Sequence, residues 1–563
     1  MSFWRRRTHS KGRYQAIEPD EILIDAANLP AFDTTRLEGR IEKPIPQSTF
    51  RMFLTAFSLL LIIALGQLAH LQIFSHDALS ARAEKNRLTT KLVPAERGLI
   101  TDRNGTTLAE NIPGKDPDTA ERSYPLGKAA AHVVGYVSYP KRDQNGYWYQ
   151  EDVQGTAGVE QAYNAALSGR NGLNIAETDA AGAVVSGNMV RSALPGTNVT
   201  LSLDAGIQKD LYETIAHRSE ASDWQGGAGA VMDIHTGEVI ALTSYPSYDP
   251  EVMSRGEPKD EVKAFLTDPR SPFLDRAVSG LYAPGSVVKP FVATAALEEH
   301  VITPEKQILS TGSISIPNPY DPTKSSVFKD WRAQGWVDMR HAIAVSSDVY
   351  FYEVGGGFQS QPGLGIAAIE RYLRSFGFGS QTGITMPGEE AGVIPDPEWK
   401  ANLFDGERWF LGDTYHTAIG QYGVQVTLAQ LVRGVSAIAN GGTLVTPVLE
   451  KGAQGAQTPT GVADSNLQVA REGMRLAVTE GIAQALAVPG VQVAAKTGTA
   501  EVGAKKEFTN SVVIGFFPYE KPRYAFAVVM ERAKAGLREG APSVMGEVMR
   551  YIVENKPDMV KEI

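Results

Sequence analysis

One uninterrupted apolar stretch limits the folds open to this chain. Residues 53 to 74, FLTAFSLLLIIALGQLAHLQIF, contain no charged side chain. A helix of this length, rising about 1.5 Å per residue, spans about 30 Å, the thickness of a bilayer's hydrocarbon core. Buried helices of soluble proteins seldom run so far without a charge, and a cleaved signal peptide has a shorter apolar core close to the N-terminus. The stretch therefore predicts a transmembrane helix.

The residues on the N-terminal side of this stretch predict its orientation. Five basic residues lie between Arg5 and Arg13, and Arg51 lies at the edge of the apolar stretch. Because cytoplasmic flanks carry an excess of Lys and Arg, we expect the N-terminus in the cytoplasm and everything after residue 74 in the periplasm or outside the cell. Residues 1–52 mix charges and prolines without a sustained period and predict a disordered cytoplasmic tail. The chain is thus expected to be a single-pass protein of the cell (inner) membrane.

Composition excludes several classes of function. The net charge of -10 argues against general binding of nucleic acid, which requires a basic surface to neutralise phosphates. The chain has no cysteine, which excludes disulfides, thiolate nucleophiles and cysteine-ligated zinc. We expect no cofactor and no metal site.

After the membrane stretch, residues 75–205 predict a small α+β module. Residues 93–102 and 106–111 have the pattern of two short strands around Asn104-Gly105, a strong hairpin signal. The polar, proline-punctuated residues 112–125 are expected to form a loop. Helical spacing covers residues 158–169, and residues 196–204 alternate as a strand. This module separates the membrane stretch from the rest of the chain.

Residues 206–563 predict a larger α+β domain. An amphipathic helix at 207–221 is followed by two strands within 227–246, which join across His235-Thr236-Gly237. Two more strands, 510–518 and 523–532, and a helix at 542–556 end the chain. This order predicts an antiparallel sheet, assembled from both ends of the domain and flanked by helices.

The first candidate for chemistry is YAPGSVVKPF, residues 282–291. Pro284 and Gly285 predict a turn, and Ser286 would open a helix with Lys289 on the same face. A serine hydroxyl needs an adjacent base to become a nucleophile, and a lysine with a depressed pKa can serve. Alone the pattern is weak, because a serine three residues before a solvated lysine is common.

Two further clusters have the same ambiguity when each is taken alone. Ser346, Ser347 and Asp348 interrupt an apolar run, where polar groups need partners. Either Ser347 or Asp348 could instead cap a helix. Residues 496–499, Lys-Thr-Gly-Thr, follow branched and small residues of an expected edge strand, where an amine, hydroxyls and a glycine suit a ligand with a carboxylate. The alternative there is an ordinary turn with a solvated lysine.

Together the three clusters carry a family resemblance. S-x-x-K, S-x-D and K-T-G in this order are the signature of penicillin-recognising acyl-serine enzymes. The sequence resembles a class B penicillin-binding protein, a peptidoglycan D,D-transpeptidase, from the membrane stretch nearly to the end. Supporting segments are RGLITDRNGTTLAEN (97–111) and GTAGVEQAYNAALSG (155–169). The segments 392–400, 409–431 and 439–449 are more similar to the elongation-type branch, penicillin-binding protein 2, than to the division-type branch.

The resemblance implies the fold and the roles of the site residues. A transpeptidase domain of the penicillin-binding-protein and β-lactamase type would lie behind a smaller α+β pedestal and one transmembrane helix. Ser286 would attack the carbonyl between two terminal D-alanines, with Lys289 as its base. Ser346, near Lys289 and Lys496, would relay the proton to the leaving amine, and the N–H groups of Ser286 and Thr499 would form the oxyanion hole.

The resemblance further assigns the substrate-binding residues. Lys496, Thr497 and Thr499 would hold the substrate carboxylate, with Gly498 in the same motif. Asp348 stands where many relatives have asparagine and would orient Lys289 and Ser346. Some relatives carry a zinc site near the catalytic serine that includes a cysteine, so with no cysteine here we expect no such metal.

The implied partners are D-Ala-D-Ala stem peptides, β-lactams and a separate polymerase, the SEDS glycosyltransferase RodA. Contacts with MreC are in doubt, because where relatives have a head subdomain this chain has only residues 112–125. Division-type transpeptidation, D,D-carboxypeptidase activity and β-lactam sensing remain alternatives. Sensing fits least, because such receptors have several spans and a metalloprotease motif that this sequence lacks.

Overall fold

The computed structural model describes residues 46–79, 88–114, 120–144, 148–178, 184–318, 321–503, 505–534, 536 and 539–561. Contacts divide the chain into two compact units, Met1–Leu88 and Thr89–Ile563, and each is described by itself. The first 45 residues of the expected cytoplasmic tail lie outside the described residues.

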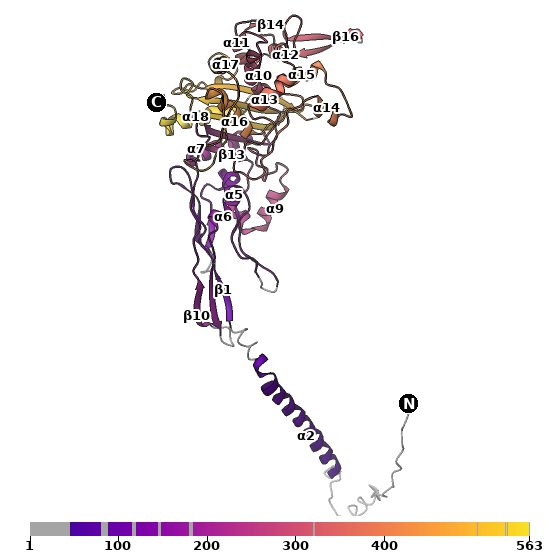
Figure 1. Ribbon diagram of the computed structural model, residues 1–563, viewed down its shortest axis with the longest axis vertical. Helices are drawn as coiled ribbons and strands as arrows, with labels where there is room; N and C mark the ends of the chain where they lie inside the picture. Colours follow the sequence, from indigo (N-terminus) through magenta and orange to yellow (C-terminus); the bar gives the residue numbers. More distant parts are fainter. Residues whose placement is uncertain are drawn as a thin grey trace, which may run out of the picture. The chain divides into compact units, whose positions relative to one another are not determined.

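The membrane stretch forms one long helix. It comprises α2 (Gln47–Ala69) and a π-helical turn, η2 (His70–Phe74) (Figure 1). No residue of either element is buried. Among the described residues it is the one helix long and apolar enough to cross a membrane by length and composition, with mean hydropathy 2.2. The helix begins at Gln47, directly after the extended N-cap residue Pro46 and ahead of residue 53, because residues 47–52 contain no glycine or proline to break it.

The second unit begins with the pedestal, a set of short strands and helices. Its strands are β1 (Leu88–Val93), β2 (Ile100–Thr101), β3 (Thr107–Pro113), β4 (Ala120–Ser123), β5 (Val137–Ser138), β6 (Lys141–Arg142), β7 (Trp148–Gln150), β8 (Gln154–Gly155), β9 (Gly172–Thr178), β10 (Val184–Arg191) and β11 (Val199–Thr200). Its helices are η3 (Gly127–Ala129), α4 (Ala131–Val134), α5 (Gly158–Ala162) and α6 (Asn164–Leu167). The larger sheets have the orders β11-β2-β3-β4 and β1-β9-β10.

Three pedestal predictions differ from the structure. Part of the expected loop 112–125 is a hairpin, because β3 continues to Pro113 and pairs with β4. The expected helix 158–169 is two short helices that meet at Tyr163. Of the expected strand 196–204, Val199–Thr200 pairs in parallel with β2, and Leu201 forms an isolated antiparallel bridge with Glu450. In each case the tertiary partner, which local pattern does not encode, sets the limits of the element.

A buried ionic cluster joins the two pedestal segments that carry the family resemblance. The Glu160 carboxylate accepts hydrogen bonds from Arg97 Nε at 2.6 Å and from Arg122 Nε at 2.7 Å. All three residues are almost completely buried. Removing one partner of such a cluster leaves an uncompensated charge in the interior, so the cluster fixes these segments relative to each other.

The larger domain contains a five-stranded antiparallel sheet. Its order is β13-β12-β22-β21-β20, formed by β12 (Gly226–Asp233), β13 (Val239–Tyr245), β20 (Ala494–Val502), β21 (Phe508–Phe517) and β22 (Tyr524–Lys534). The first hairpin pairs with the last strand, Ala230 opposite Ala527, so both ends of the domain build one sheet as predicted. One edge strand of this sheet is β20, which carries the Lys-Thr-Gly-Thr motif, and the other is β13.

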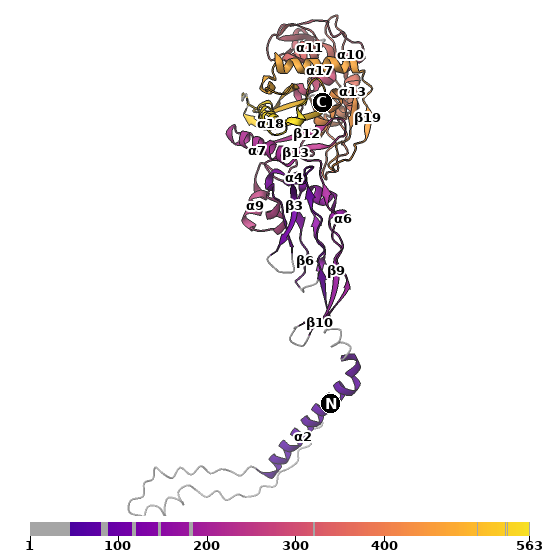
Figure 2. The ribbon, with the colours of Figure 1, turned by 90° about the vertical axis from the view of Figure 1, so that its left-hand side faces the viewer.

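Helices cover both faces of this sheet (Figures 1 and 2). On one face, α7 (Ala205–Ala221) and α18 (Ala541–Asn555) pack together and against the strands. On the other face lie α16 (Leu428–Ala439) and α17 (Asp464–Thr479), with α10 (Lys289–Glu298) against α17. The remaining helices are α8 (Pro250–Arg255), α9 (Lys259–Thr267), η4 (Gly285–Val288), α11 (Met339–Val345), α12 (Asp348–Gly356), α13 (Ile366–Ser375), α14 (Pro397–Leu403), α15 (Leu411–Ala418), η5 (Gln484–Leu486) and η6 (Pro557–Met559). Small strands outside the main sheet are β14 (Ile308–Ser310), β15 (Ser313–Asn318), β16 (Asp321–Lys329), β17 (Gly335–Val337), β18 (Thr443–Val445) and β19 (Gln457–Pro459).

Hydrogen bonds link the pedestal to the start of α7. Asp102 Oδ2 accepts from the Ala205 N–H at 3.0 Å. Gln208 Nε2 donates to the Ala129 carbonyl at 2.7 Å, inside the protein. Asp102 comes from the predicted Asn104-Gly105 hairpin, so that hairpin contributes directly to the contact between pedestal and domain.

Candidate active site

Ser286 lies in a tight turn that leads into a helix. Gly285 has φ +58, and residues 285–288 form the 3-10 turn η4. The α-helix α10 begins at Lys289, with Pro290 in its first turn, where a missing N–H costs nothing. The helix expected to open at Ser286 thus starts as a 3-10 turn that includes Ser286 and becomes an α-helix at Lys289. The tighter turn still places positions 286 and 289 on the same side, because side chains three apart eclipse in a 3-10 helix.

Close backbone contacts fix this turn against the edge strand. A Cβ on Gly285 would lie 2.7 Å from the Thr499 carbonyl oxygen, and one on Gly498 would lie 2.6 Å from the Pro284 oxygen. Behind the turn, the Gly285 N–H donates to the Gly420 carbonyl at 3.0 Å. Glycine is needed at these contacts because any side chain would separate the two backbones. The turn with Ser286 and the strand with Thr499 are thus held side by side.

Lys289 is fully buried and reaches the second cluster. Its Nζ donates to Ser346 O at 2.9 Å, Ser346 Oγ at 3.2 Å and Asp348 Oδ1 at 2.6 Å. These are three acceptors for the three N–H groups of an ammonium. The Ser286 hydroxyl, which is partly exposed, forms no hydrogen bond with any residue in the described part of the chain, so the expected Ser286–Lys289 contact is absent in this state.

The loop with Ser346 has an unusual conformation. Ser346 ends α11 with φ 59 and ψ 45, a left-handed conformation that is uncommon for a residue with a side chain. Ser347 then caps α12, its hydroxyl accepting from the Tyr350 N–H at 3.3 Å. The capping role considered for Ser347 is therefore real, and both of its neighbours, Ser346 and Asp348, contact Lys289. Strained residues of this kind concentrate at functional sites.

Lys496 approaches Ser346 from the opposite side. Its Nζ lies 2.9 Å from Ser346 Oγ and donates to the Thr497 carbonyl at 2.7 Å. Burial lowers the pKa of Lys496 well below its usual value, and the charge of Lys289 lowers this pKa further, while Asp348 raises it. The Ser346 hydroxyl therefore lies between two amines, and burial favours the neutral form of Lys496.

The Lys-Thr-Gly-Thr motif lies on the exposed edge of the sheet. Along β20 the side chain of Lys496 is buried, Thr497 is half-buried and Thr499 is exposed. An edge strand has N–H groups that no neighbouring strand takes up, and these are free for an added ligand. The structure thus brings together Ser286, Lys289, Ser346, Asp348 and the four motif residues, all predicted from sequence.

Asp330 is a site residue that the sequence reasoning missed. Its carboxylate accepts from Ser347 Oγ at 2.8 Å and from the Val349 N–H at 3.1 Å, next to the two cluster residues Ser346 and Asp348. The sequence signal that could have pointed to Asp330 was a single aspartate directly after the alternating residues of a strand. Nothing in its spacing connects it with Ser346.

His416, on α15, is partly buried. Its ring packs against Phe328 and Tyr352, with centroid distances of 5.5 and 6.4 Å. Burial lowers its pKa, and the charges of Lys506 and Asp348 act on it in opposite directions. Within the described residues, no group of three or more His, Cys, Asp or Glu side chains is placed to hold a metal ion.

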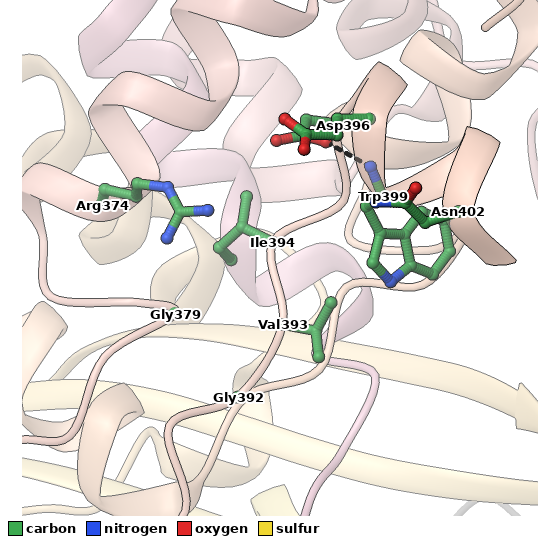
Figure 3. Close-up of a pocket in the computed structure, with 9 residues that line it drawn as sticks. Arg374, Gly379, Gly392, Val393, Ile394, Asp396, Trp399 and Asn402 are labelled. Atoms are coloured by element: carbon green, nitrogen blue, oxygen red, sulfur yellow. Dashed lines mark hydrogen bonds between the residues drawn. The ribbon is translucent and has the colours of Figure 1, made fainter. Parts of the chain in front are cut away.

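A pocket of about 280 Å³ lies apart from the three motifs, and none of their residues lines it (Figure 3). Its wall includes Asp396, which caps α14 by accepting from the Trp399 N–H at 2.7 Å. A Cβ on Gly423 would lie 2.4 Å from the Trp399 ring, and Val393 pairs with Gln425. Segment 392–400, used above to assign the branch, therefore packs against the loop that continues from Gly420 behind the Ser286 turn.

The comparison with known families agrees with this geometry. Residues 227–554 match the penicillin binding protein transpeptidase domain. The chain belongs to the penicillin-binding protein transpeptidase family. Residues 117–201 match the penicillin-binding protein dimerisation domain, which covers most of the pedestal of this penicillin-binding protein.

Curated relatives place this penicillin-binding protein within class B, as PBP2-like. The peptidoglycan D,D-transpeptidase MrdA of Acinetobacter baumannii is 28% identical over 84% of this chain and 83% of its own length. MrdA of Haemophilus influenzae is 27% identical over 94% of this chain and 96% of its own length. The resemblance inferred from the three motifs is thereby confirmed at the level of family and branch.

Solved structures with the same fold include PBP2 proteins. PBP2 of Helicobacter pylori in complex with MreC has a TM-score of 0.69, with 26% identity, over 83% of this chain and 99% of its own length. Pseudomonas aeruginosa PBP2 in complex with WCK 5153 has a TM-score of 0.69 and 28% identity, over 84% of this chain and 99% of its own length. A chain in a peptidoglycan synthase complex has a TM-score of 0.70 and 26% identity, over 92% of this chain and all of its own length. The predicted fold class is confirmed.

Proposed function

We propose that this chain is a peptidoglycan D,D-transpeptidase of the elongation type, which cross-links stem peptides through a serine acyl-enzyme and releases D-Ala. In this role it would maintain rod shape and be a target of penicillin. The observation that carries the proposal is the position of the Ser346 hydroxyl, within hydrogen-bond distance of both Lys289 and the buried Lys496. Such an arrangement is suited to moving a proton to and from a nearby serine nucleophile.

Acylation begins at Ser286. Its oxygen attacks the carbonyl between the two terminal D-alanines while its proton passes to Lys289, which requires that Lys289 has first given up one proton. Lys289 donates to the Ser346 hydroxyl, and the inclination of Lys496 toward its neutral form provides an acceptor beyond it. The path Lys289, Ser346, Lys496 therefore frees the base without a histidine.

The oxyanion and the substrate carboxylate would meet the turn and the edge strand. The Ser286 N–H is near the start of a helical turn, where N–H groups have no intrahelical partner, and Thr499 lies across from it on β20. Both N–H groups would donate to the developing oxyanion. Lys496, Thr497 and Thr499 would hold the carboxylate of the terminal D-Ala, with Gly498 permitting the close approach of turn and strand.

The second half of the reaction transfers the acyl group. When the C–N bond breaks, the leaving D-Ala amine takes a proton through Ser346. An acceptor amine from a second stem peptide then attacks the ester carbonyl and gives up a proton to Ser346 and Lys496. The Ser286 oxygen leaves and takes back the proton that Lys289 holds. Hydrolysis would use water in place of this amine, so the active-site groups alone do not separate the two outcomes.

Replacing Asp348 with asparagine is expected to preserve much of the acylation. The asparagine oxygen can still accept from Lys289 Nζ, which lies 2.6 Å from Asp348 Oδ1, although the charge is lost. We expect the rate of acylation by a labelled penicillin to stay within about tenfold of the wild-type rate, because one charge-assisted hydrogen bond becomes a neutral one. Asp338→Asn, which alters a helix cap outside the motifs, is the control. Near-complete loss in Asp348→Asn alone would contradict the orienting role.

The domain organisation follows from this assignment. Residues 1–52 would be the cytoplasmic tail, 53–74 the membrane span, 75–205 the pedestal and 206–563 the transpeptidase domain on the periplasmic or extracytoplasmic side. The chain is membrane-anchored, and the five basic residues between Arg5 and Arg13 support a cytoplasmic N-terminus.

A separate polymerase is the proposed partner, because the pedestal is too small to contain a glycosyltransferase. The similarity to a chain of a peptidoglycan synthase complex supports such a partner, and we propose the SEDS glycosyltransferase RodA, contacting α2 and the pedestal. The complex of H. pylori PBP2 with MreC raises a second possible partner. The connection between β3 and β4 is short here, so we expect any contact with MreC to use other parts of the pedestal.

Product analysis tests the proposed reaction. The full-length protein in detergent would receive a stem-peptide donor ending in D-Ala-D-Ala and an amine acceptor, and the products would be separated by mass. We expect D-Ala release together with the cross-linked dimer, both lost in Ser286→Ala. D-Ala release with only the hydrolysed donor would instead identify a carboxypeptidase.

A further inference from the structure

The loop that places Ser346 is held from both sides by two consecutive residues, Asp330 and Trp331. They follow β16 directly, and no sequence motif includes them. Asp330 is almost completely buried, whereas Trp331 is 53% exposed. Their contacts fall on the residues immediately before and after Ser346.

The Asp330 carboxylate holds the side that follows Ser346. Its Oδ2 accepts from Ser347 Oγ at 2.8 Å and from the Val349 N–H at 3.1 Å, the first groups of α12. The same oxygen accepts from Ser310 Oγ at 3.0 Å, which anchors the carboxylate to β14. All three groups that contact this oxygen are hydrogen-bond donors, which is favourable for an ionised carboxylate at the positive end of a helix.

The Trp331 indole holds the side that precedes Ser346. Its Nε1–H donates to the Val345 carbonyl at 3.2 Å. The Trp331 backbone N–H donates in turn to Asp330 Oδ1 at 2.9 Å, so the Asp330 carboxylate is bonded both to Trp331 and to the residues after Ser346. Ser346 is therefore bracketed between residue 345 and residue 347, each bonded to the same two-residue segment.

The bracket explains why Ser346 keeps an unfavourable conformation. A left-handed backbone at a residue with a side chain is unfavourable and persists only where its surroundings impose it. In this conformation both the carbonyl oxygen and the hydroxyl of Ser346 contact Lys289 Nζ, at 2.9 and 3.2 Å. Relaxation of residue 346 would move both acceptors, and with them the link to Lys496.

We infer that Asp330, together with the Trp331 indole N–H, positions Ser346 for proton transfer during acylation. The inference rests on the proposed function and adds to it two positioning residues that touch neither substrate nor Ser286. They act through Ser346, by fixing the distances from its hydroxyl to the two lysines. Displacements of about 1 Å in such a path can reduce a rate by about a hundredfold.

Asp330→Asn and Asp330→Ala provide a graded test. In the asparagine variant one end of the amide is a donor, which must face either the Trp331 N–H or the donors of Ser347 and Val349. Alanine removes the anchor completely. Asp396→Asn, which changes the cap of α14 away from the motifs, is the matched control. Trp331→Phe keeps an aromatic ring and removes only the donor to Val345.

Stopped-flow acylation by a chromogenic β-lactam separates the noncovalent dissociation constant from the acylation rate constant, and titration with the same compound counts active sites. We expect the rate constant per active site to fall about tenfold or more in Asp330→Asn and further in Asp330→Ala, with the dissociation constant within about threefold. Asp396→Asn should change neither. Trp331→Phe, an exposed change that leaves the fold intact, should lower the rate constant about threefold.

The outcomes separate positioning from stability. A lower count of active sites with an unchanged rate constant would show a purely structural role and overturn the inference. If the Asp330 variants do not fold, an unchanged rate constant in Trp331→Phe overturns it. Failure of the wild-type protein to form an acyl-enzyme at Ser286 would instead overturn the proposed function, which the same experiment detects first.

Discussion

Ser286→Ala is expected to abolish covalent labelling by a fluorescent penicillin. Among the described motif serines, Ser286 is the one whose hydroxyl forms no hydrogen bond, whereas the Ser346 hydroxyl lies between two lysines and Ser347 bonds Asp330. Without an oxygen nucleophile no acyl-enzyme forms, so we expect labelling per folded protein to fall about a thousandfold or more. In-gel fluorescence gives the extent of labelling, and intact mass shows whether an adduct is present.

Ser375→Ala serves as the control for this loss. The Ser375 hydroxyl donates to the Tyr372 carbonyl at 2.9 Å at the end of α13, outside the three motifs. The Ser375→Ala variant should be labelled to the same extent as the wild-type protein. Equal labelling of Ser286→Ala and Ser375→Ala would contradict the assignment of Ser286 as the nucleophile. A mass adduct located on another serine would then identify that serine as the nucleophile.

Lys496→Met is expected to lower acylation while raising stability at neutral pH. The amine is lost from the proton path and from the carboxylate site, and removing such a group typically costs about a hundredfold or more in rate. Yet the wild-type fold must bury this amine, which lowers its pKa, and methionine of similar length needs no hydration. The substitution should therefore trade activity for stability, as active-site replacements often do.

The stability gain should depend on pH with a definite sign. Because the folded pKa of Lys496 is depressed, the unfolded state binds more protons between that pKa and about 10.4, the value for an unperturbed lysine. The free energy of unfolding of the wild-type protein then rises with pH across this window relative to the variant. The advantage of Lys496→Met is thus largest below the folded pKa and shrinks as pH approaches about 10.

Denaturant titrations of both proteins between neutral and alkaline pH measure this difference. Lys505→Met, a change at an exposed lysine on the same β20–β21 hairpin, is the matched control and should show neither the loss of acylation nor the pH-dependent gap. A gap between wild type and Lys496→Met that widens with pH would contradict a depressed Lys496 pKa in the folded protein.

Much of the domain could be predicted from sequence because its signals are local. The amphipathic helix α7, the hairpin of β12 and β13 and the helix α18 all show their period in the sequence, and each appears at nearly the expected residues. The pedestal was harder, because its short elements take their limits from partners. The pairing of β3 with β4, in a segment expected to be a loop, is one case.

The sequence also named the residues that the structure brings together, whereas the hydrogen bonds between them could not be predicted. Ser286, Lys289, Ser346, Asp348 and Lys496 belong to short motifs whose residue types already indicate acyl-serine chemistry. The sequence suggested that Ser286 and Lys289 meet. The folded chain instead directs Lys289 Nζ to Ser346 and Asp348, because the loop after α11 places three acceptors around it.

By itself, the sequence determined what depends on residue type and spacing along the chain: an apolar helix of membrane length, a serine and a lysine on one side of a turn, and a lysine on an edge strand. Tertiary structure alone decided which side chains from distant parts of the sequence come into contact. Segments distant in sequence bring Lys496 to Ser346, bury it and so depress its pKa, and place Asp330 and Trp331 around the same serine. Burial and the contacts between distant segments arise only when the chain is folded, and they set the protonation and the geometry on which the chemistry depends.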